Sequence, residues 1–447
     1  MHGAPCKAKH PMSDSFGIHS LEEVLAWLGC KPLTQNAAVV GQARRIVLDT
    51  LGCAYAGSRA DSLVSLQETC ARVDPGRVRL GNGPGLSVGA AAQLFAYAAC
   101  WDEACEGHAG AHGRPGVATL AAVHALAGSL SYREVLTAFI HGYEVSARMA
   151  RALRIKPGMH VDGNWPAFGC AVAAARALGL TDRQTASAVS FAACQVPMSL
   201  YLPVRQGSTA RNAYLGHAAV LGIQGALAAH AGIDAPTLES VSEYARVGLG
   251  KEVGPWVGPG RFEILDAYLK PFAAVRHVHY GAAAAIALRQ GIGASRIEQI
   301  RLSVYEEATV YCANRAPATA IQAQFSLTFG LAAALRFGRI DHETYRPAQF
   351  NDQELRRLES LVEVAVDPDL TARQARGATL RVLVDGQWLE TTVGTILGDA
   401  ALPLTDAQVI EKFVSYARGT VGLDSARRIA SDLLYGDLDV PYAGLLV

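Results

Sequence analysis

The sequence is poor in aromatic residues, has no excess of charge of either sign, and contains no apolar run long enough to span a bilayer. Aromatic residues make up 7% of its 447 residues, and 40 basic side chains are balanced by 40 acidic ones. A chain with no net charge has no field that attracts nucleic acid or anionic lipid. Apolar runs such as ATLAAVHALAG are far shorter than the roughly 18 residues of a membrane helix. These absences predict a soluble protein with no nucleic-acid partner and no membrane partner.

The cysteines lack the spacing of a metal or disulfide framework. There are nine, an odd number, and no two form a CxxC pair. The first residues, MHGAPCKAKHP, contain no apolar core of a signal peptide and are interpreted as a tail. Together these features predict a cytoplasmic protein.

Small and apolar residues dominate instead, in a pattern typical of closely packed helices. Half of the chain is hydrophobic, and it contains 44 glycines. From about residue 20 to 245, segments such as HAAVLGIQGALAAHAG carry apolar residues at i, i+3, i+4 and i+7. Thr181 and Asp182 precede one such segment as a helix start. This part of the chain is predicted to be an all-helical bundle.

The pattern changes after about residue 250. The segments RIEQIRLSVYEEATVY and GATLRVLVDGQWLETTV alternate apolar and polar residues, with Asp385-Gly386 as a turn between two strands. FSLTFGLAAALRFG lies between them and has a helical pattern, as do two segments after Thr405. We therefore predict a mainly α fold: a helical domain, 1–270 and 405–447, and an inserted α+β lid domain, 271–404. A cleft is expected where they meet.

The segment WDEACEGHAGAHGRPG concentrates titratable side chains on a glycine-rich stretch. It contains Asp102, Glu103, Glu106, His108 and His112. On a helix the two histidines, four residues apart, would point the same way as metal ligands do, but the glycines argue against a helix. Three interpretations remain: a loop for acid and base chemistry, a metal site, or a solvated polar loop.

Two further positions combine a loop or helix start with nearby cations. His160 follows a basic helix end, and cationic neighbours keep an imidazole neutral, as a base requires. Arg211 is predicted at a helix start, where backbone N–H groups and a guanidinium together bind a carboxylate. The alternatives are a surface histidine and a capping residue with a surface ion pair.

A basic segment, KPFAAVRHVH, lies at the predicted domain boundary. His277 and His279 would share a face on a strand and could chelate a metal, whereas on a helix they diverge by roughly 200°. Lys270 and Arg276 beside them favour recognition of an anionic substrate. A basic hinge facing solvent is the alternative.

Eight segments in order resemble the MmgE/PrpD family, which includes 2-methylcitrate dehydratase, cis-aconitate decarboxylase and iminodisuccinate epimerase. The resemblance covers about residues 20 to 420. The matching segments are AYAACWDEA with HGRPGVATLAAVHALA, HGYEVSARMARA, KPGMH, FGCAVAAARALGL, GSTARNAYLGHAAVLG, YLKPFAAVRHVH, NRAPATAIQAQFSLTFGLAAAL and LPLTDAQVIEKF. The family implies a large helical domain with an α+β lid, a homodimer, and an active site between the domains that needs no cofactor.

The resemblance also implies roles for particular residues. Asp102 matches an acidic position of the family, and Glu103 the acid beside it. His160 matches a histidine that follows a glycine, and Lys270 and His279 match the lysine and histidine of the lid entrance. The tyrosine that the family places before its N-R-P stretch corresponds to Tyr311.

The chain departs from the family at two places. Arg114 precedes Pro115 where members have His-Pro, so that histidine's task is either lost or taken over by His112 or His108. Several members have lysine where Arg211 stands, and only lysine releases a proton readily.

These observations lead to one main hypothesis, a cofactor-independent lyase of dehydratase type for a small di- or tricarboxylic acid. In it Arg211, Lys270, Arg276 and Arg114 hold carboxylates. His160 is the base, with Asp102 orienting it or sharing that role, and His279 or Tyr311 is the acid. Glu103 and His112 complete the predicted substrate site. No metal or cofactor is expected.

Three alternatives stay open. An epimerase or a decarboxylase for a similar acid would begin with the same proton abstraction. A carboxylate-binding protein without catalysis would fit the replacement of histidine by Arg114. A metal enzyme would use the histidines instead.

Overall fold

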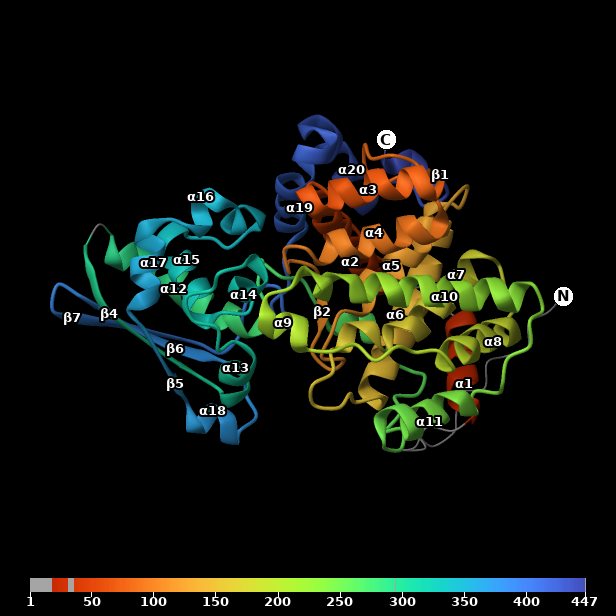
Figure 1. The fold of residues 1–447 in the computed structure, drawn as a ribbon, viewed down its shortest axis with the longest axis horizontal. Helices are drawn as coiled ribbons and strands as arrows, with labels where there is room; N and C mark the ends of the chain where they lie inside the picture. Colours follow the sequence, from red (N-terminus) through yellow and green to blue (C-terminus); the bar gives the residue numbers. More distant parts are fainter. Residues whose placement is uncertain (1–17, 31–35, 294, 447) are drawn as a thin grey trace.

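The computed structural model describes residues 18–30, 36–293 and 295–446, which form two lobes (Figure 1). The lobe that we call the helical lobe contains the helices up to α11 together with the two C-terminal helices. The other, the sheet lobe, contains a four-stranded sheet and the helices that cover it. The first 11 residues, which we predicted to be a tail, lie outside the described residues. The prediction of a mainly α fold is confirmed.

The helical lobe is built from amphipathic and fully buried helices. α8 begins as predicted, because Thr181 and Gln184 form a reciprocal capping box at its N-terminus. The helices of this lobe up to α11 are α1 (Ile18–Gly29), α2 (Ala37–Gly57), α3 (Asp61–Val73), α4 (Val88–Cys100), α5 (Pro115–Leu126), α6 (Tyr132–Ala152), α7 (Pro166–Ala177), α8 (Asp182–Ala193), α9 (Leu202–Gln206), α10 (Tyr214–His230) and α11 (Glu239–Tyr244). Three short strands accompany them: β1 (Pro75–Val78), β2 (Gly107–His108) and β3 (Ala267–Tyr268).

Helix α7 lies at the centre of this lobe, in contact with α5, α6, α8 and α10. It crosses α6 where two glycines meet. A Cβ at Gly169 would lie 2.5 Å from the Gly142 carbonyl oxygen, and a Cβ at Gly142 would lie 2.6 Å from that of Gly169. The small residues of the sequence therefore let helix backbones approach one another closely.

The sheet lobe has the strand order β5-β4-β6-β7, with β5 parallel to β4 and the other pairs antiparallel. The strands are β4 (Ile297–Val304), β5 (Val362–Val366), β6 (Ala378–Val384) and β7 (Gln387–Val393). The helices of this lobe are α12 (Arg276–Ile292), α13 (Glu306–Tyr311), α14 (Ala320–Gln324), α15 (Leu327–Phe337), α16 (Pro347–Phe350), α17 (Gln353–Ser360) and α18 (Pro368–Ala372). Alternate residues of β6 are buried, and α12 packs on β6 and β7.

The hairpin predicted at Asp385-Gly386 is confirmed. Both residues have positive φ, 49° and 73°, as the tight turn between β6 and β7 requires. The expectation of a continuous strand over RIEQIRLSVYEEATVY was wrong in its second half. β4 ends at Val304, and EEATVY forms α13, whose first turn carries two glutamates that suit a helix N-terminus. β5 was not predicted.

The chain returns to the helical lobe at its end, since α19 (Asp406–Val421) packs on α2 and α20 (Leu423–Tyr435) packs on both. The short helices α9 and α14 contact each other where the lobes meet (Figure 1). The domain limits at 270 and 405 stay predictions. Within the described part of the chain, no helix is long and apolar enough to cross a bilayer.

Candidate active site

A cavity of about 430 Å³ receives side chains from both lobes. Helical-lobe residues such as His160 and sheet-lobe residues such as Tyr311 line it. Its charged lining residues are six cations and three carboxylates: Arg114, Arg154, Arg211, Lys270, Arg276, Arg376, Glu103, Asp162 and Glu307. Positive charge is therefore in excess along its lining, which favours an anion over a cation.

Glu103 is the centre of the cationic cluster. Lys270 Nζ donates to its Oε1 at 2.6 Å and to its backbone oxygen at 3.0 Å. Arg114 donates to its Oε2 at 3.3 Å, and Arg211 forms an ion pair with the same oxygen. Burial opposes ionisation, but Arg114, Arg211 and Lys270 outweigh it and hold the pKa of Glu103 well below its usual range. The carboxylate therefore stays ionised and gathers three cations from three separate segments.

The backbone of Glu103 is in the left-handed region, with a φ of 53°. A residue other than glycine rarely adopts this conformation, and such residues concentrate at functional sites. The turn follows the end of α4, and it directs the carboxylate toward Arg211, which lies in the 3-10 turn Thr209–Ala213. Arg211 thus precedes α10 rather than starting an α-helix, and the carboxylate it binds belongs to the protein.

His160 lies beside a second buried carboxylate, that of Asp162. Its Nδ1 accepts the Asp162 backbone N–H at 3.2 Å, and the Asp162 Oδ2 atom lies 3.7 Å from the same nitrogen. Burial, with Arg211 and Arg114 nearby, lowers the pKa of His160 to about 4, so the ring is neutral at pH 7. Arg114 pairs with Asp162 and lowers the pKa of that carboxyl group despite its burial.

A row of four aromatic rings runs along the cavity from His160 to His277. His160 stacks on Tyr201 at 5.9 Å, and Tyr201 meets Tyr311 edge-on at 5.7 Å. Tyr311 then stacks on His277 at 5.8 Å. Burial lowers the pKa of His277 to about 3, and its Nδ1 lies 2.6 Å from the Tyr305 hydroxyl. The cavity therefore presents neutral imidazoles among cations.

Eight of the predicted residues line this cavity: His160, Tyr311, Arg211, Lys270, Arg276, Arg114, His112 and Glu103. Asp102 and His279 do not belong to the described lining. His279 is fully buried, and both of its ring nitrogens are occupied, by the Ala274 carbonyl oxygen at 3.0 Å and by Arg276 at 3.3 Å. Because α12 begins at Arg276, His277 and His279 diverge on a helix, and His277 reaches the cavity instead.

Asp102 faces a different part of the molecule. The charges that act on it are those of Arg346, Glu343 and Asp341, which surround a short turn of the sheet lobe. Burial raises the pKa of Asp102 to about 7. Among the described residues, the carboxylate next to the His160 ring is that of Asp162 and not that of Asp102.

The glycine-rich segment is packed into the protein rather than solvated. Asp102, Glu103, Glu106 and His108 are all buried, so the interpretation as a solvated polar loop was wrong. Residues 107–108 form β2, which pairs with β3, and no helix forms there. A Cβ at Gly110 would lie 2.3 Å from the Arg151 guanidinium carbon. This glycine therefore allows close packing rather than flexibility.

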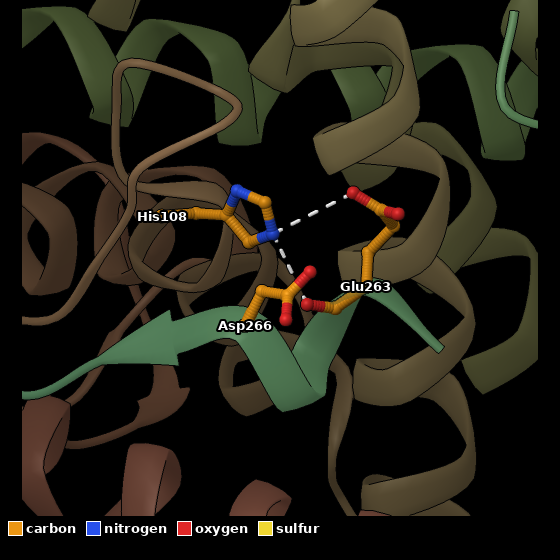
Figure 2. A group of neighbouring side chains, drawn as sticks. All are labelled: His108, Glu263 and Asp266. Carbon is orange, nitrogen blue, oxygen red and sulfur yellow. Dashed lines mark hydrogen bonds and ion pairs between the residues drawn. The ribbon is translucent and has the colours of Figure 1, made fainter. Parts of the chain in front are cut away.

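His108, Glu263 and Asp266 lie close enough to hold a metal ion (Figure 2). Their donor atoms already have partners, however. The His108 Nε2 atom lies 3.1 Å from the Glu263 carbonyl oxygen, and Nδ1 accepts the Ala111 N–H. Arg151 donates to Glu263 at 2.6 Å, and Arg261 pairs with Asp266. A metal would have to displace these partners, so the group fits a hydrogen-bonded cluster better than a metal centre.

Sequence reasoning assigned no role to Asp162, Tyr201 and Arg376, and it considered Arg154 only as part of the basic helix end before His160. Asp162 stands two residues after His160, and an aspartate so close to a candidate histidine was an available signal. Tyr201 and Arg376 carried no local signal, because they are brought to the cavity from distant segments.

Comparison with protein families supports the resemblance inferred from the motifs. The family model described as "MmgE/PrpD N-terminal domain" matches residues 23–248, and the model described as "MmgE/PrpD C-terminal domain" matches residues 272–434. Among curated proteins, no sequence matches the chain. The family consists generally of enzymes of the dehydratase and lyase type that act on carboxylic acids. Since the two matches cover most of the chain, this protein belongs to the MmgE/PrpD family.

Proposed function

We propose that this protein is a lyase of dehydratase type that removes a proton alpha to a carboxylate of a small di- or tricarboxylic acid. The observation that carries the proposal is the excess of cations around neutral imidazoles in one cavity. Cations of this kind stabilise the enolate charge that develops when the proton leaves.

Two buried polar atoms at the cavity have no hydrogen-bond partner among the residues that the structure describes. These are Arg211 Nε and the Tyr201 hydroxyl. A buried polar atom without a hydrogen bond is costly, and a ligand carboxylate would supply the missing acceptor. Arg211 also lies over the Phe325 ring at 5.3 Å, which keeps the guanidinium plane in place.

His160 is the proton-transferring group in this proposal, with Asp162 as the carboxylate beside it. The Asp162 N–H donates to Nδ1 and so favours the tautomer with the proton on Nε2. For His160 to accept a proton at Nε2, the ring must carry a proton on Nδ1, which then faces the Asp162 carboxylate 3.7 Å away. The carboxylate stabilises the resulting imidazolium.

Tyr311 is the acid in the dehydration. The C–H electron pair moves into the enolate as His160 takes the proton, and the C–O bond then breaks. The leaving hydroxyl takes the Tyr311 proton and departs as water. An epimerase would instead return a proton to the same carbon, and a decarboxylase would release carbon dioxide.

The test is incubation of the protein in deuterated water with two hydroxy acids, citrate and malate, and separately with cis-aconitate, which already contains a double bond and tests decarboxylation. We expect an unsaturated acid, detected by ultraviolet absorbance, and its loss in Arg211→Gln. Deuterium incorporation without an alkene would point to an epimerase, and carbon dioxide release to a decarboxylase. If every acid stays unchanged in the presence of folded protein, the proposed function is wrong and a binding role without catalysis remains.

A further inference from the structure

The cavity contains a second group of cations that Glu103 does not hold. Arg154 follows α6 of the helical lobe, and Arg376 precedes β6 of the sheet lobe. His112 lines the cavity with them. We call Arg154, Arg376 and His112 with Glu307 the outer pole, and Glu103 and Asp162 with Arg114, Arg211 and Lys270 the inner pole.

The two poles are distinct in their electrostatic surroundings. The charges acting on His160 are those of Asp162, Arg211, Arg114 and Glu103. By contrast, those acting on His112 include Arg154, Arg376 and Glu307. The charges acting on the two histidines therefore come from different side chains of one cavity.

Each pole has one positive charge in excess. At the inner pole three cations share the carboxylates of Glu103 and Asp162. At the outer pole Arg376 donates to Glu307 at 3.3 Å, and within the described ranges Arg154 forms no ion pair. The remaining lining cation, Arg276, pairs with Asp399.

His112 is held in a conformation that points to a functional role. Its φ is 52°, in the left-handed region that residues other than glycine rarely adopt. It is exposed at the cavity, and partial burial together with Arg154 and Arg376 lowers its pKa. The imidazole is thus a neutral hydrogen-bonding group under the influence of two guanidinium groups.

We infer that the outer pole binds a second carboxylate of the ligand whose first carboxylate is bound at the inner pole. The charge excess at each pole corresponds to one carboxylate of the proposed di- or tricarboxylic acid. Arg154 and Arg376 belong to different lobes, so such a ligand joins the lobes (Figure 1). This inference rests on the proposed function, because it places the reacting end of the acid at the inner pole.

Calorimetric binding of two probe acids tests the inference. The probes are tricarballylate, with three carboxylates, and propanoate, with one. Arg154→Gln and Arg376→Gln are each expected to weaken tricarballylate binding about tenfold, the size of a lost charge-assisted contact, and to leave propanoate binding unchanged. Glu307→Gln should have the opposite effect and strengthen tricarballylate binding, because it removes the carboxylate that competes for Arg376.

Two controls separate this inference from the proposed function. Arg373→Gln changes an exposed arginine in the same segment as Arg376, outside the cavity lining, and should bind both acids as the parent does. Arg211→Gln should weaken both acids. If only Arg211→Gln weakens binding, the outer pole is refuted and the proposed function stands. Two other results would also refute the second carboxylate site: the parent protein binds neither acid, or it binds both equally tightly.

Discussion

At the scale of single residues, Glu103 is expected to have a large effect on stability. Glu103→Gln keeps the shape of the side chain but leaves three buried cations without their shared carboxylate. Removing one partner of a buried ion pair costs about 3–5 kcal/mol, so the free energy of unfolding in urea should fall by about that amount. Glu363→Gln, at the exposed pair with Arg301, should change it by about 1 kcal/mol or less. Equal losses in the two variants would contradict the role of Glu103.

The residue scale also separates a side chain that reacts from one that holds another in place. One ring nitrogen of His279 forms a hydrogen bond with the Ala274 carbonyl oxygen, and the other forms one with Arg276. Arg276 in turn lies over the Tyr268 ring at 4.5 Å and pairs with Asp399. We therefore assign His279 to the placement of Arg276 within the cavity wall.

At the scale of elements, α19 holds two segments of the site together through Lys412. Its buried ammonium group donates to Asp49 Oδ1 at 2.5 Å, the Ala104 carbonyl at 2.7 Å and the Lys270 carbonyl at 2.9 Å. Lys270 in turn donates to the backbone oxygen of Glu103, the residue next to Ala104. A C-terminal helix thus fixes the distance between the glycine-rich segment and the connection to the sheet lobe.

Lys412→Met should reduce both stability and turnover. The buried Asp49 carboxylate loses its partner, which costs about 3–5 kcal/mol in the free energy of unfolding. The double variant Asp49→Leu with Lys412→Met removes both charges and should recover most of that stability. Its kcat, measured on whichever acid the turnover test identifies, should stay at least about tenfold below that of the parent, because neither backbone carbonyl is held. Recovery of kcat together with stability would show that Lys412 acts on stability alone.

At the scale of the whole molecule, buried titratable groups predict a stability maximum near neutral pH. Burial lowers the pKa of His141 and His277 to about 3 and of His160 to about 4. Below about pH 6.5 the unfolded chain binds protons that these rings do not, so stability falls as the pH falls toward 4. Burial raises the pKa of Asp102 to about 7 and of Glu106 to about 8. As the pH rises toward those values, the unfolded chain ionises these two carboxyl groups while the folded protein keeps them protonated, so the free energy of unfolding falls.

The free energy of unfolding, measured in urea from pH 4 to 9, should therefore be highest at about pH 6–7. His141→Gln provides a matched control, because His141 is buried outside the cavity lining. This variant should show a shallower loss on the acid side and an unchanged loss on the alkaline side. An acid side with the same slope in parent and variant would contradict the assignment of buried neutral histidines.

Local patterns were sufficient to predict most elements of the fold. Apolar spacing located the long helices, Thr181 located the start of α8, and Asp385-Gly386 located the hairpin. The predictions failed where pairing with a neighbouring strand decides the secondary structure. β5 is five residues long and forms by pairing with β4. The segment EEATVY alternates apolar and polar residues only weakly, and it forms α13 because β4 ends at Val304.

The sequence by itself determined which kinds of side chain this protein offers: balanced charges, small helix-packing residues, and a set of cations and imidazoles in the motifs of one family. Only the tertiary structure decided which of them meet. It placed Asp162 rather than Asp102 beside His160, and His277 rather than His279 at the cavity. The physical reason is that spacing along the chain sets the face of an element, whereas contacts such as Arg211 with Glu103, 108 residues apart, depend on how whole helices pack.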